Sequence, residues 1–236
     1  MKKALFLSLA TSSLLLVTTV SMPATEIAKW TFETSQPLAA PGAANWLTNI
    51  SAEVGTGTAS ALHSGASVYT TPAGNGSAHS ISSTNWTVGD LYQFEASTVG
   101  FSTIQLEWDQ ASSGTGPGDF KLFYSTDGSA FSQFGSDYTI LVNGAPNAAW
   151  NSSTVNPAFH YIVDLSSITA LDNISTAYFR LVDGNTTSAN GGTVAATGTD
   201  RVDNFTIEIV PEPQSLSLCL LGGLGILSCR FARRKK

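Results

Sequence analysis

Short runs of alternating apolar and polar residues dominate the middle of the chain. In residues 103–110, the apolar side chains of Ile104, Leu106 and Trp108 alternate with polar ones. This is the period of a strand that buries one face and leaves the other in water. Nothing between residues 25 and 210 repeats its apolar positions with the period of a long helix. The pattern predicts an all-β domain.

A hairpin and regularly spaced runs extend this prediction to a sandwich. Residues 120–124 and 131–134 flank an Asp127-Gly128 pair, which supplies the positive φ of a tight turn. Turn-rich links separate such short strands, as is typical of an antiparallel β-sandwich, in which first and last strands are often neighbours. Long, nearly uncharged loops are the expected binding surface. The further strands are predicted at 27–32, 92–95, 139–142, 160–165, 176–182 and 203–210, and the loops at 34–44, 55–76, 144–157 and 183–199.

The two ends of the chain differ from the middle. Lys2 and Lys3 precede an apolar run, which predicts a signal peptide over residues 1–24, with a retained anchor as the alternative. Near the other end, residues 214–230 are apolar and predict one short transmembrane helix with its basic end in the cytoplasm. The basic cluster consists of Arg230, Arg233, Arg234, Lys235 and Lys236. The folded domain is therefore expected to occupy residues 25–209.

Charge is distributed unevenly along the chain. The whole sequence carries a formal charge of −6, but residues 25–210 hold four Lys and Arg against sixteen Asp and Glu, which gives −12. A domain with this much negative charge repels phosphate backbones, which excludes nucleic acid as a partner. Neutral glycans or divalent cations are more compatible with its charge. Both cysteines, Cys219 and Cys229, lie in the tail. The domain therefore has no disulfide.

One pair of carboxylates suggests an enzyme as the rival class. Glu107 and Asp109 are two residues apart in a predicted strand and share a face, as the acid and nucleophile of a glycoside hydrolase do. The spacing resembles that of laminarinase-like β-sandwich hydrolases, but Ser112 stands where their final carboxylate belongs. The competing interpretation is a solvated strand face, and we favour a domain without catalytic residues.

Two further sets of side chains are candidates for binding. Glu33, Asp200 and Asp203 carry the hard oxygen ligands that calcium prefers. In the alternative interpretation, Asp200 and Asn204 make turns and Arg201 pairs with a carboxylate on a neighbouring strand. Tryptophan rings exposed on loops can stack on sugars, and three lie in polar, loop-like surroundings: Trp46, Trp86 and Trp150. For these rings, a contact with the core is the competing interpretation, whereas Trp108 is expected to be buried.

The tail carries a recognisable motif. Val210, Pro211, Glu212 and Pro213 precede the apolar segment and the basic cluster, and this order resembles the PEP-CTERM sorting signal over residues 210–236. The resemblance implies a bacterial protein that signal peptidase and then an exosortase process. It would be held in the inner membrane by its C-terminal segment and then delivered to the cell surface or the medium. A permanent single-pass anchor is the alternative.

The domain itself resembles the jelly-roll sandwiches of such proteins, through residues 123–129 and 201–205. In jelly-roll carbohydrate-binding modules a structural calcium often ties the first and last strands, which draws attention to Glu33 and Asp203. The resemblance therefore implies a structural or polysaccharide-binding envelope protein, with exopolysaccharide as its partner. The alternative function is a secreted glycoside hydrolase of the β-sandwich type.

Overall fold

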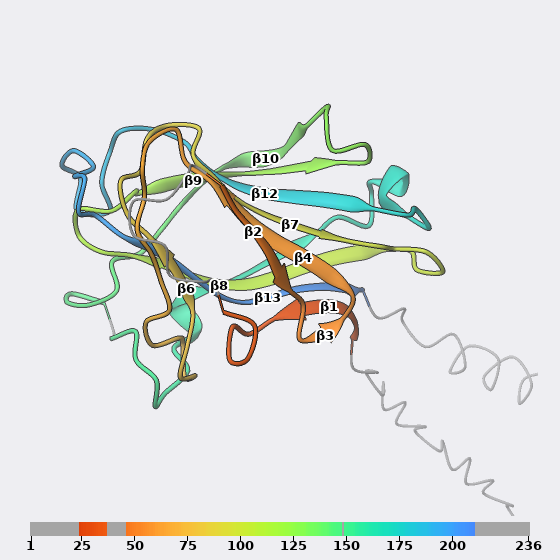
Figure 1. The fold of residues 1–236 in the computed structure, drawn as a ribbon, viewed down its shortest axis with the longest axis horizontal. Helices are drawn as coiled ribbons and strands as arrows, with labels where there is room; N and C mark the ends of the chain where they lie inside the picture. The colour runs from red at the N-terminus through yellow and green to blue at the C-terminus, as the bar shows by residue number, and fades with distance from the viewer. Residues whose placement is uncertain (1–23, 37–45, 148, 211–236) are drawn as a thin grey trace, which may run out of the picture. The chain divides into compact units, whose positions relative to one another are not determined.

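The domain is a sandwich of two antiparallel sheets (Figure 1). The computed structural model describes residues 24–36, 46–147 and 149–210. The predicted signal peptide and sorting tail lie outside these ranges, except for Ala24 and Val210. Within them, no helix is long and apolar enough to cross a membrane. The short helices that are present are two 3-10 turns, Pro157–Phe159 and Thr169–Leu171.

The first sheet brings the two ends of the domain together. Its path is β11 (His160–Asp164), β8 (Ile104–Ser112), β13 (Asp200–Ile209), β1 (Thr25–Trp30) and β3 (Val54–Gly55), with β6 (Ile81–Ser83) on β13 and β5 (Tyr69–Thr70) on β6. β1 pairs with β13, so that Thr25 lies opposite Ile209. The first and last strands are therefore neighbours, as expected.

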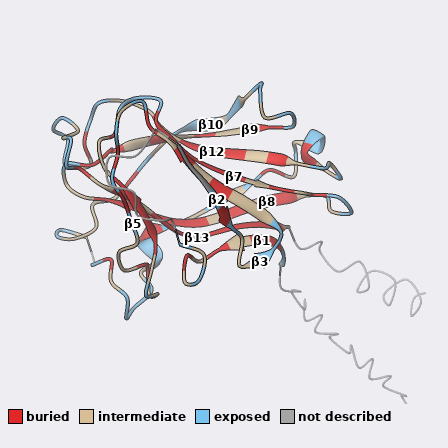
Figure 2. Cartoon of the chain, viewed as in Figure 1, coloured by how far each residue is buried: buried red, intermediate tan, exposed pale blue. Residues whose placement is uncertain are grey.

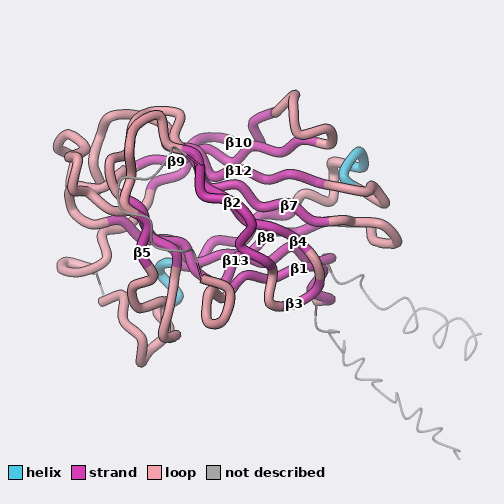
Figure 3. The backbone as a smooth tube through the Cα atoms, viewed as in Figure 1, coloured by secondary structure: helices cyan, strands magenta, loops and turns pink. Residues whose placement is uncertain are grey.

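The second sheet has six strands and covers the first. Its order is β10 (Ser132–Thr139), β9 (Asp119–Ser125), β12 (Ala177–Asp183), β7 (Leu91–Ala96), β4 (Gly57–Leu62) and β2 (Trp46–Ser51). In β12, buried and half-exposed positions alternate along the whole strand, whereas β7 is buried at all but one position and the edge strand β10 is mostly exposed. Figure 2 shows the buried positions as red bands along the strands, and Figure 3 shows the longer loops gathered mostly at one end of them.

Aromatic side chains fill the space between the sheets. The rings of Phe94 and Phe205 come from different sheets and stack with centroids 3.6 Å apart. Trp30 packs edge-on against both. All three are nearly completely buried. Truncating a buried aromatic ring to alanine typically costs about 3–5 kcal/mol, so this contact accounts for much of the cohesion between the sheets.

At the other end of β13 the interior is polar. The Asp200 carboxylate accepts hydrogen bonds from Gln110 Nε2 at 3.1 Å and Ser112 Oγ at 3.0 Å. Tyr138 Oη and Trp108 Nε1 both donate to Gln110 Oε1 at 3.0 Å. Burial raises the pKa of Asp200 well above its usual value, which favours the neutral acid at this place.

The predicted strands correspond closely to observed ones, with two exceptions. The 139–142 strand is wrong, because β10 ends at Thr139 and Val142 makes only an isolated bridge to Ser112. The predicted loop 55–76 contains all of β4 and the short β5, and the small residues Gly57 to Ala61 of β4 gave no strong strand signal. These residues pair with β7 throughout, so tertiary pairing outweighs weak local propensity.

Candidate functional site

The outer face of the six-stranded sheet carries a row of hydrogen-bonded side chains. Strand alternation turns Arg180 outward between the buried Phe179 and Leu181. The register places Arg180 opposite Gln93, and Glu95 on the same face of β7 opposite Thr58. Four strands therefore contribute to one surface: β4, β7, β12 and the adjacent β9.

These side chains are connected in a continuous row. Thr58 Oγ1 donates to Glu95 Oε1 at 2.7 Å. Gln93 Nε2 donates to Glu95 Oε2 at 3.4 Å, and Arg180 Nε donates to Gln93 Oε1 at 2.8 Å. We call Thr58, Gln93, Glu95 and Arg180 the polar strip. Its planar groups are held by one another, which reduces the entropy lost when a ligand binds.

Aromatic rings flank the polar strip at its Arg180 end. The guanidinium carbon of Arg180 lies 3.4 Å from the centroid of the Phe131 ring. Tyr178 stands on the same face of β12, with its ring edge-on to Phe131 at 6.5 Å. Phe123 lies opposite Arg180 on β9 and is half-exposed. Rings beside planar hydrogen-bonding groups form the combination that binds sugars.

The turn that carries Phe131 is fixed by its own hydrogen bonds. Asp127 Oδ1 accepts from the backbone nitrogens of Ser129 and Ala130, both at 2.8 Å. These bonds hold the pKa of Asp127 below its usual value. Gly128 has a φ of +71°, and a Cβ there would lie 3.0 Å from Tyr178 Cζ. The Asp-Gly turn was predicted, and it packs directly on the aromatic side of the surface.

The Arg180 guanidinium has no anionic partner. Among the described residues, no carboxylate lies within ion-pair distance of it, and the bond to Gln93 uses only Nε. Burial alone lowers its pKa, with no contribution from a neighbouring charge. Arginine remains charged throughout the physiological range. Its two Nη groups are therefore free to bind a ligand.

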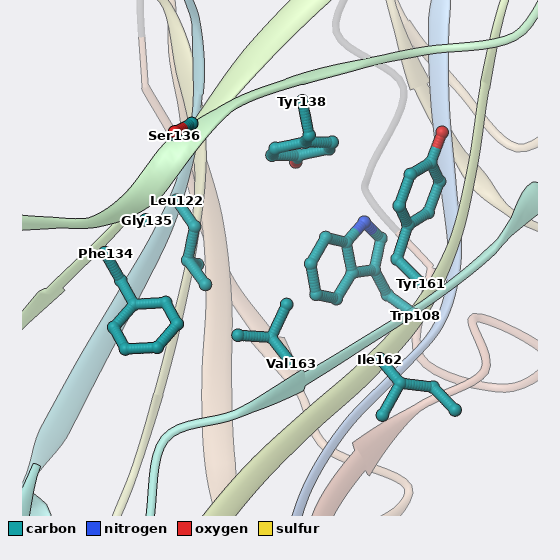
Figure 4. A pocket seen from close by; sticks show the side chains of 9 residues that line it. All are labelled: Trp108, Leu122, Phe134, Gly135, Ser136, Tyr138, Tyr161, Ile162 and Val163. Carbon is teal, nitrogen blue, oxygen red and sulfur yellow. The ribbon is translucent and has the colours of Figure 1, made fainter. Parts of the chain in front are cut away.

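A second candidate is a cavity of about 290 Å³ where the edge strands of the two sheets meet. Figure 4 shows Trp108 and Tyr161 side by side, with Tyr138 and Val163 close by. Trp108 and Tyr161 are stacked at 5.4 Å with an interplanar angle of 14°. We call this cavity the edge pocket.

The polar atoms of the three large aromatic side chains around the edge pocket are already bonded. Tyr161 Oη donates to Thr139 O at 3.0 Å, and the Tyr138 and Trp108 donors both point to Gln110. Most of the remaining lining is aliphatic or aromatic. The edge pocket therefore suits an apolar group better than the hydroxyl-rich edge of a sugar.

The carboxylates of the enzyme hypothesis are turned toward the protein. His160 Nδ1 lies 2.9 Å from Asp109 Oδ1, and Asn204 Nδ2 donates to Asp109 Oδ2 at 2.9 Å. Glu107 Oε2 lies 3.7 Å from His160 Nε2. Asp109 is only 3% exposed, so the prediction of a wet side chain is wrong there. With both oxygens engaged, Asp109 ties β8 to β11 and β13 and does not face a substrate.

The predicted calcium ligands do not come together. Asp200 faces the interior, whereas Asp203 lies on the outer side of β13 and accepts from Ser77 Oγ at 2.7 Å and Asn75 N at 2.9 Å. Glu33 reaches the same loop and accepts from His79 N at 2.8 Å. Within the described ranges, no group of three His, Cys, Asp or Glu residues is arranged to hold a metal. The three-carboxylate site is therefore wrong.

The alternative interpretation of this segment is also wrong. Asp200 lies inside β13 and makes no turn. Asn204 has a φ of +51° at the register shift between Asp203 and Thr206, so it forms a β-bulge. No described carboxylate forms an ion pair with Arg201, and its Nε is buried without a hydrogen-bond partner. The segment is thus a bent central strand.

Two of the three predicted tryptophans, Trp86 and Trp150, do not offer a binding surface. Trp86 and Trp150 are each 6% exposed. Trp86 Nε1 donates to Ser83 O at 3.0 Å, and Trp150 Nε1 donates to Ala73 O at 2.6 Å. Both rings serve as core contacts, the competing interpretation, and Trp108 is buried as predicted. The side chain of Trp46 lies outside the described residues.

Sequence reasoning missed every residue of the polar strip. It placed the binding surface on loops, whereas the strip lies on strands. Residues 92–95 and 176–182 alternate in polarity, but this places Gln93 and Arg180 outward only once it is known which face of each strand packs on the core. Their pairing spans 87 residues, and no local pattern encodes it.

Neither a protein-family model nor a curated protein matches the sequence. Similar solved structures include the K2 cleaved adhesin domain of Lys-gingipain, with 15% identity over 76% of this chain and 97% of that one and a TM-score of 0.41. A family 11 carbohydrate-binding module from Clostridium thermocellum, in complex with a mixed-linked tetrasaccharide, has 14% identity over 80% and 99% and a TM-score of 0.38. TmCBM61 in complex with β-1,4-galactotriose has 11% identity over 77% and 94% and a TM-score of 0.39.

Proposed function

We propose that the β-sandwich is a non-catalytic polysaccharide-binding module, with the polar strip and its flanking rings as the binding surface. One observation carries the proposal. Tyr178, Phe131 and Phe123 lie beside a row of planar amide, carboxylate and guanidinium groups on one sheet face, which is half-exposed at these rings and at Arg180 and Glu95, whereas Gln93 is 9% exposed. Sugar rings offer apolar faces to aromatic rings and hydroxyls to planar polar groups.

The rigidity of the surface supports binding without catalysis. Its side chains stand on paired strands and are hydrogen-bonded to one another, so little ordering is needed when a chain of sugars is bound. The Glu107 and Asp109 cluster, the rival site, lies on the other sheet with Asp109 enclosed. We therefore expect no release of reducing sugar from any polysaccharide that the protein binds.

Affinity electrophoresis of the purified protein tests the surface. Gels would contain the exopolysaccharide of the native host, or else mixed-linkage glucan, galactan or glucuronoxylan. We expect retardation in at least one, and Tyr178→Ala to weaken it about tenfold, since a stacked ring contributes on the order of 1–2 kcal/mol.

Tyr161→Ala is the matched control, because it removes a tyrosine from the edge pocket and leaves the polar strip unchanged. It should retain the wild-type retardation. The proposal is wrong if Tyr161→Ala abolishes binding while Tyr178→Ala does not, or if no polysaccharide retards the protein.

For the chain as a whole, we propose export and exosortase sorting to the cell surface or the medium. The order of Val210, Pro211, Glu212 and Pro213 before an apolar segment and a basic cluster supports this. Val210 N still donates to Thr103 O at 2.8 Å, so the motif begins where the sheet ends. A C-terminus near Pro211 to Pro213, found by mass spectrometry and lost when the exosortase is deleted, is expected. An intact tail through Lys236 would contradict the proposal.

A further inference from the structure

We propose that the polysaccharide is acidic, and that a carboxylate of the sugar chain binds the Nη groups of Arg180. The inference rests on the proposed function and adds the chemical class of the ligand. It also departs from the expectation of a neutral glycan, which followed from net charge. A local arrangement, rather than the net charge of the domain, decides which group binds at a particular place.

Arg180 stands out among the four cations of the domain. Lys29 pairs with Glu26 at 2.8 Å, and Lys121 lies 3.7 Å from Asp137. Arg201 is on the other sheet, and its Nε is buried. In a domain with sixteen carboxylates and four cations, an outward-facing arginine without a carboxylate partner is unexpected. Although acidic residues are abundant, no carboxylate in the described ranges lies within ion-pair distance of Arg180, and Glu95 on the same face is linked to it only through Gln93.

The guanidinium is held in a fixed orientation. Phe131 covers one side of it at 3.4 Å, and Gln93 Oε1 accepts from Nε at 2.8 Å. A stacked and hydrogen-bonded guanidinium loses little freedom when it binds, and its two Nη groups match the two oxygens of a carboxylate. A neutral hydroxyl would use only one of these donors and would not compensate the charge.

The surroundings limit how densely charged the ligand is. Glu95 occupies the next outward position on β7, and Asp137 lies near Lys121 across β9. A polymer with a carboxylate on every ring would be repelled by these groups and by the domain as a whole, whose formal charge is −12. The geometry fits a mainly neutral chain with isolated uronate residues, whose neutral rings contact Tyr178 and Phe123.

Glucuronoxylan and its carboxyl-reduced derivative make a matched pair of probes, because they differ only at the uronate. With the full-length protein, we expect about tenfold tighter binding to glucuronoxylan than to the reduced polymer, as is usual for a charge-assisted pair of hydrogen bonds. Arg180→Gln should remove that difference, and Arg180→Lys should remove most of it. Lys29→Gln changes the net charge equally on the other sheet and should preserve it.

The outcomes separate this inference from the function on which it rests. Equal binding of both polymers, with Tyr178→Ala still weakening it, overturns the acidic ligand and leaves polysaccharide binding intact. Failure to bind either polymer or any other polysaccharide overturns both. The uronate inference is also overturned if Arg180→Gln and Lys29→Gln lose the same amount of affinity for glucuronoxylan. Tighter binding to dextran sulfate than to glucuronoxylan overturns it as well. Near-ultraviolet circular dichroism should confirm that both Arg180 variants are folded, which is expected because the Nη groups bond to no residue in the part of the chain that the structure describes.

Discussion

The outer faces of the two sheets use charge in opposite ways. On the seven-stranded sheet, neighbouring side chains occupy the oxygens of the carboxylates. Asp109 is hydrogen-bonded to His160 and Asn204, and Asp203 to Ser77. On the six-stranded sheet, the polar strip is bonded internally along its length but leaves the Nη groups of Arg180 open. The first face is richer in charge, yet the second has more to offer a ligand.

The difference teaches that unsatisfied bonding capacity, rather than the density of charged residues, marks a binding surface. A buried carboxylate that already accepts two hydrogen bonds serves the fold, and removing it leaves its donors unpaired. An outward guanidinium with free donors contributes little to the fold, because water bonds it equally well. The two faces should therefore respond differently to equivalent substitutions.

The largest expected effect is on the stability of the seven-stranded sheet. Asp109→Ala removes the partner of His160 Nδ1 and one of the two acceptors of Asn204 Nδ2, and should lower the free energy of unfolding by about 3 kcal/mol. Arg180→Ala should lower it by less than about 1 kcal/mol. Urea denaturation of both variants measures the contrast. If Asp109→Ala were as stable as wild type, this carboxylate would not be needed for the fold. That result would favour the enzyme hypothesis.

The second effect is the pH dependence of the same face. Burial raises the pKa of Asp203 to about 7 from its usual 3.8, outweighing the hydrogen bonds from Ser77 and Asn75. Between these values the unfolded chain releases the proton while the folded one keeps it. Stability therefore falls as pH rises from about 4 to about 7 and is level above that. We expect Asp203 to account for about 2 kcal/mol of this fall, roughly half the unrelaxed value.

Asp203→Asn tests that assignment, because it cannot titrate. Denaturation measured from pH 4 to pH 8 should give a shallower decline than wild type, whatever the variant's absolute stability. The same series on Asp137→Asn, an exposed residue of the other sheet, should follow the wild-type slope. Parallel slopes for Asp203→Asn and wild type would show that the loop around Asn75 and Ser77 leaves Asp203 accessible to water.

The fold was largely predictable from the sequence, since its signals are local. The alternation around Trp108 and the Asp127-Gly128 turn each specify an element within a few residues, and both are present. Where the signal is weak, as in the small residues of β4, only pairing with β7 makes the strand. The closing pair of β1 and β13 followed from a general property of sandwiches.

The site was not predictable, because it depends on which distant residues become neighbours. Trp86 and Trp150 lie in loop-like sequence but are folded onto core contacts. Asp200 and Asp203 are close in sequence yet lie on opposite sides of β13, since side chains alternate along a strand. Arg180 gave no signal in the sequence, because only the placement of the neighbouring strands shows that no described carboxylate pairs with it.

A smaller effect concerns the ring that holds Arg180. Phe131→Ala removes the surface against which the guanidinium is stacked, and should weaken binding to glucuronoxylan about three- to fivefold, as an exposed cation–π contact predicts. Phe134→Ala, which alters the edge pocket from the same hairpin, is the control and should bind as wild type does. A loss confined to Phe134→Ala would move the binding surface to the edge pocket.

The smallest effect separates a specific contact from general attraction. Lys121 lies on the same outer face as Arg180 but is paired with Asp137 at 3.7 Å and is partly exposed. An exposed pair of this kind contributes little, so Lys121→Gln should change stability by less than about 0.5 kcal/mol and affinity for glucuronoxylan by less than about twofold. Titration calorimetry at matched ionic strength measures the change. If Lys121→Gln weakened binding as much as Arg180→Gln, the anion would be attracted by the summed charge of the face. The difference between an arginine with unused donors and carboxylates with bonded oxygens would then not explain where the ligand binds.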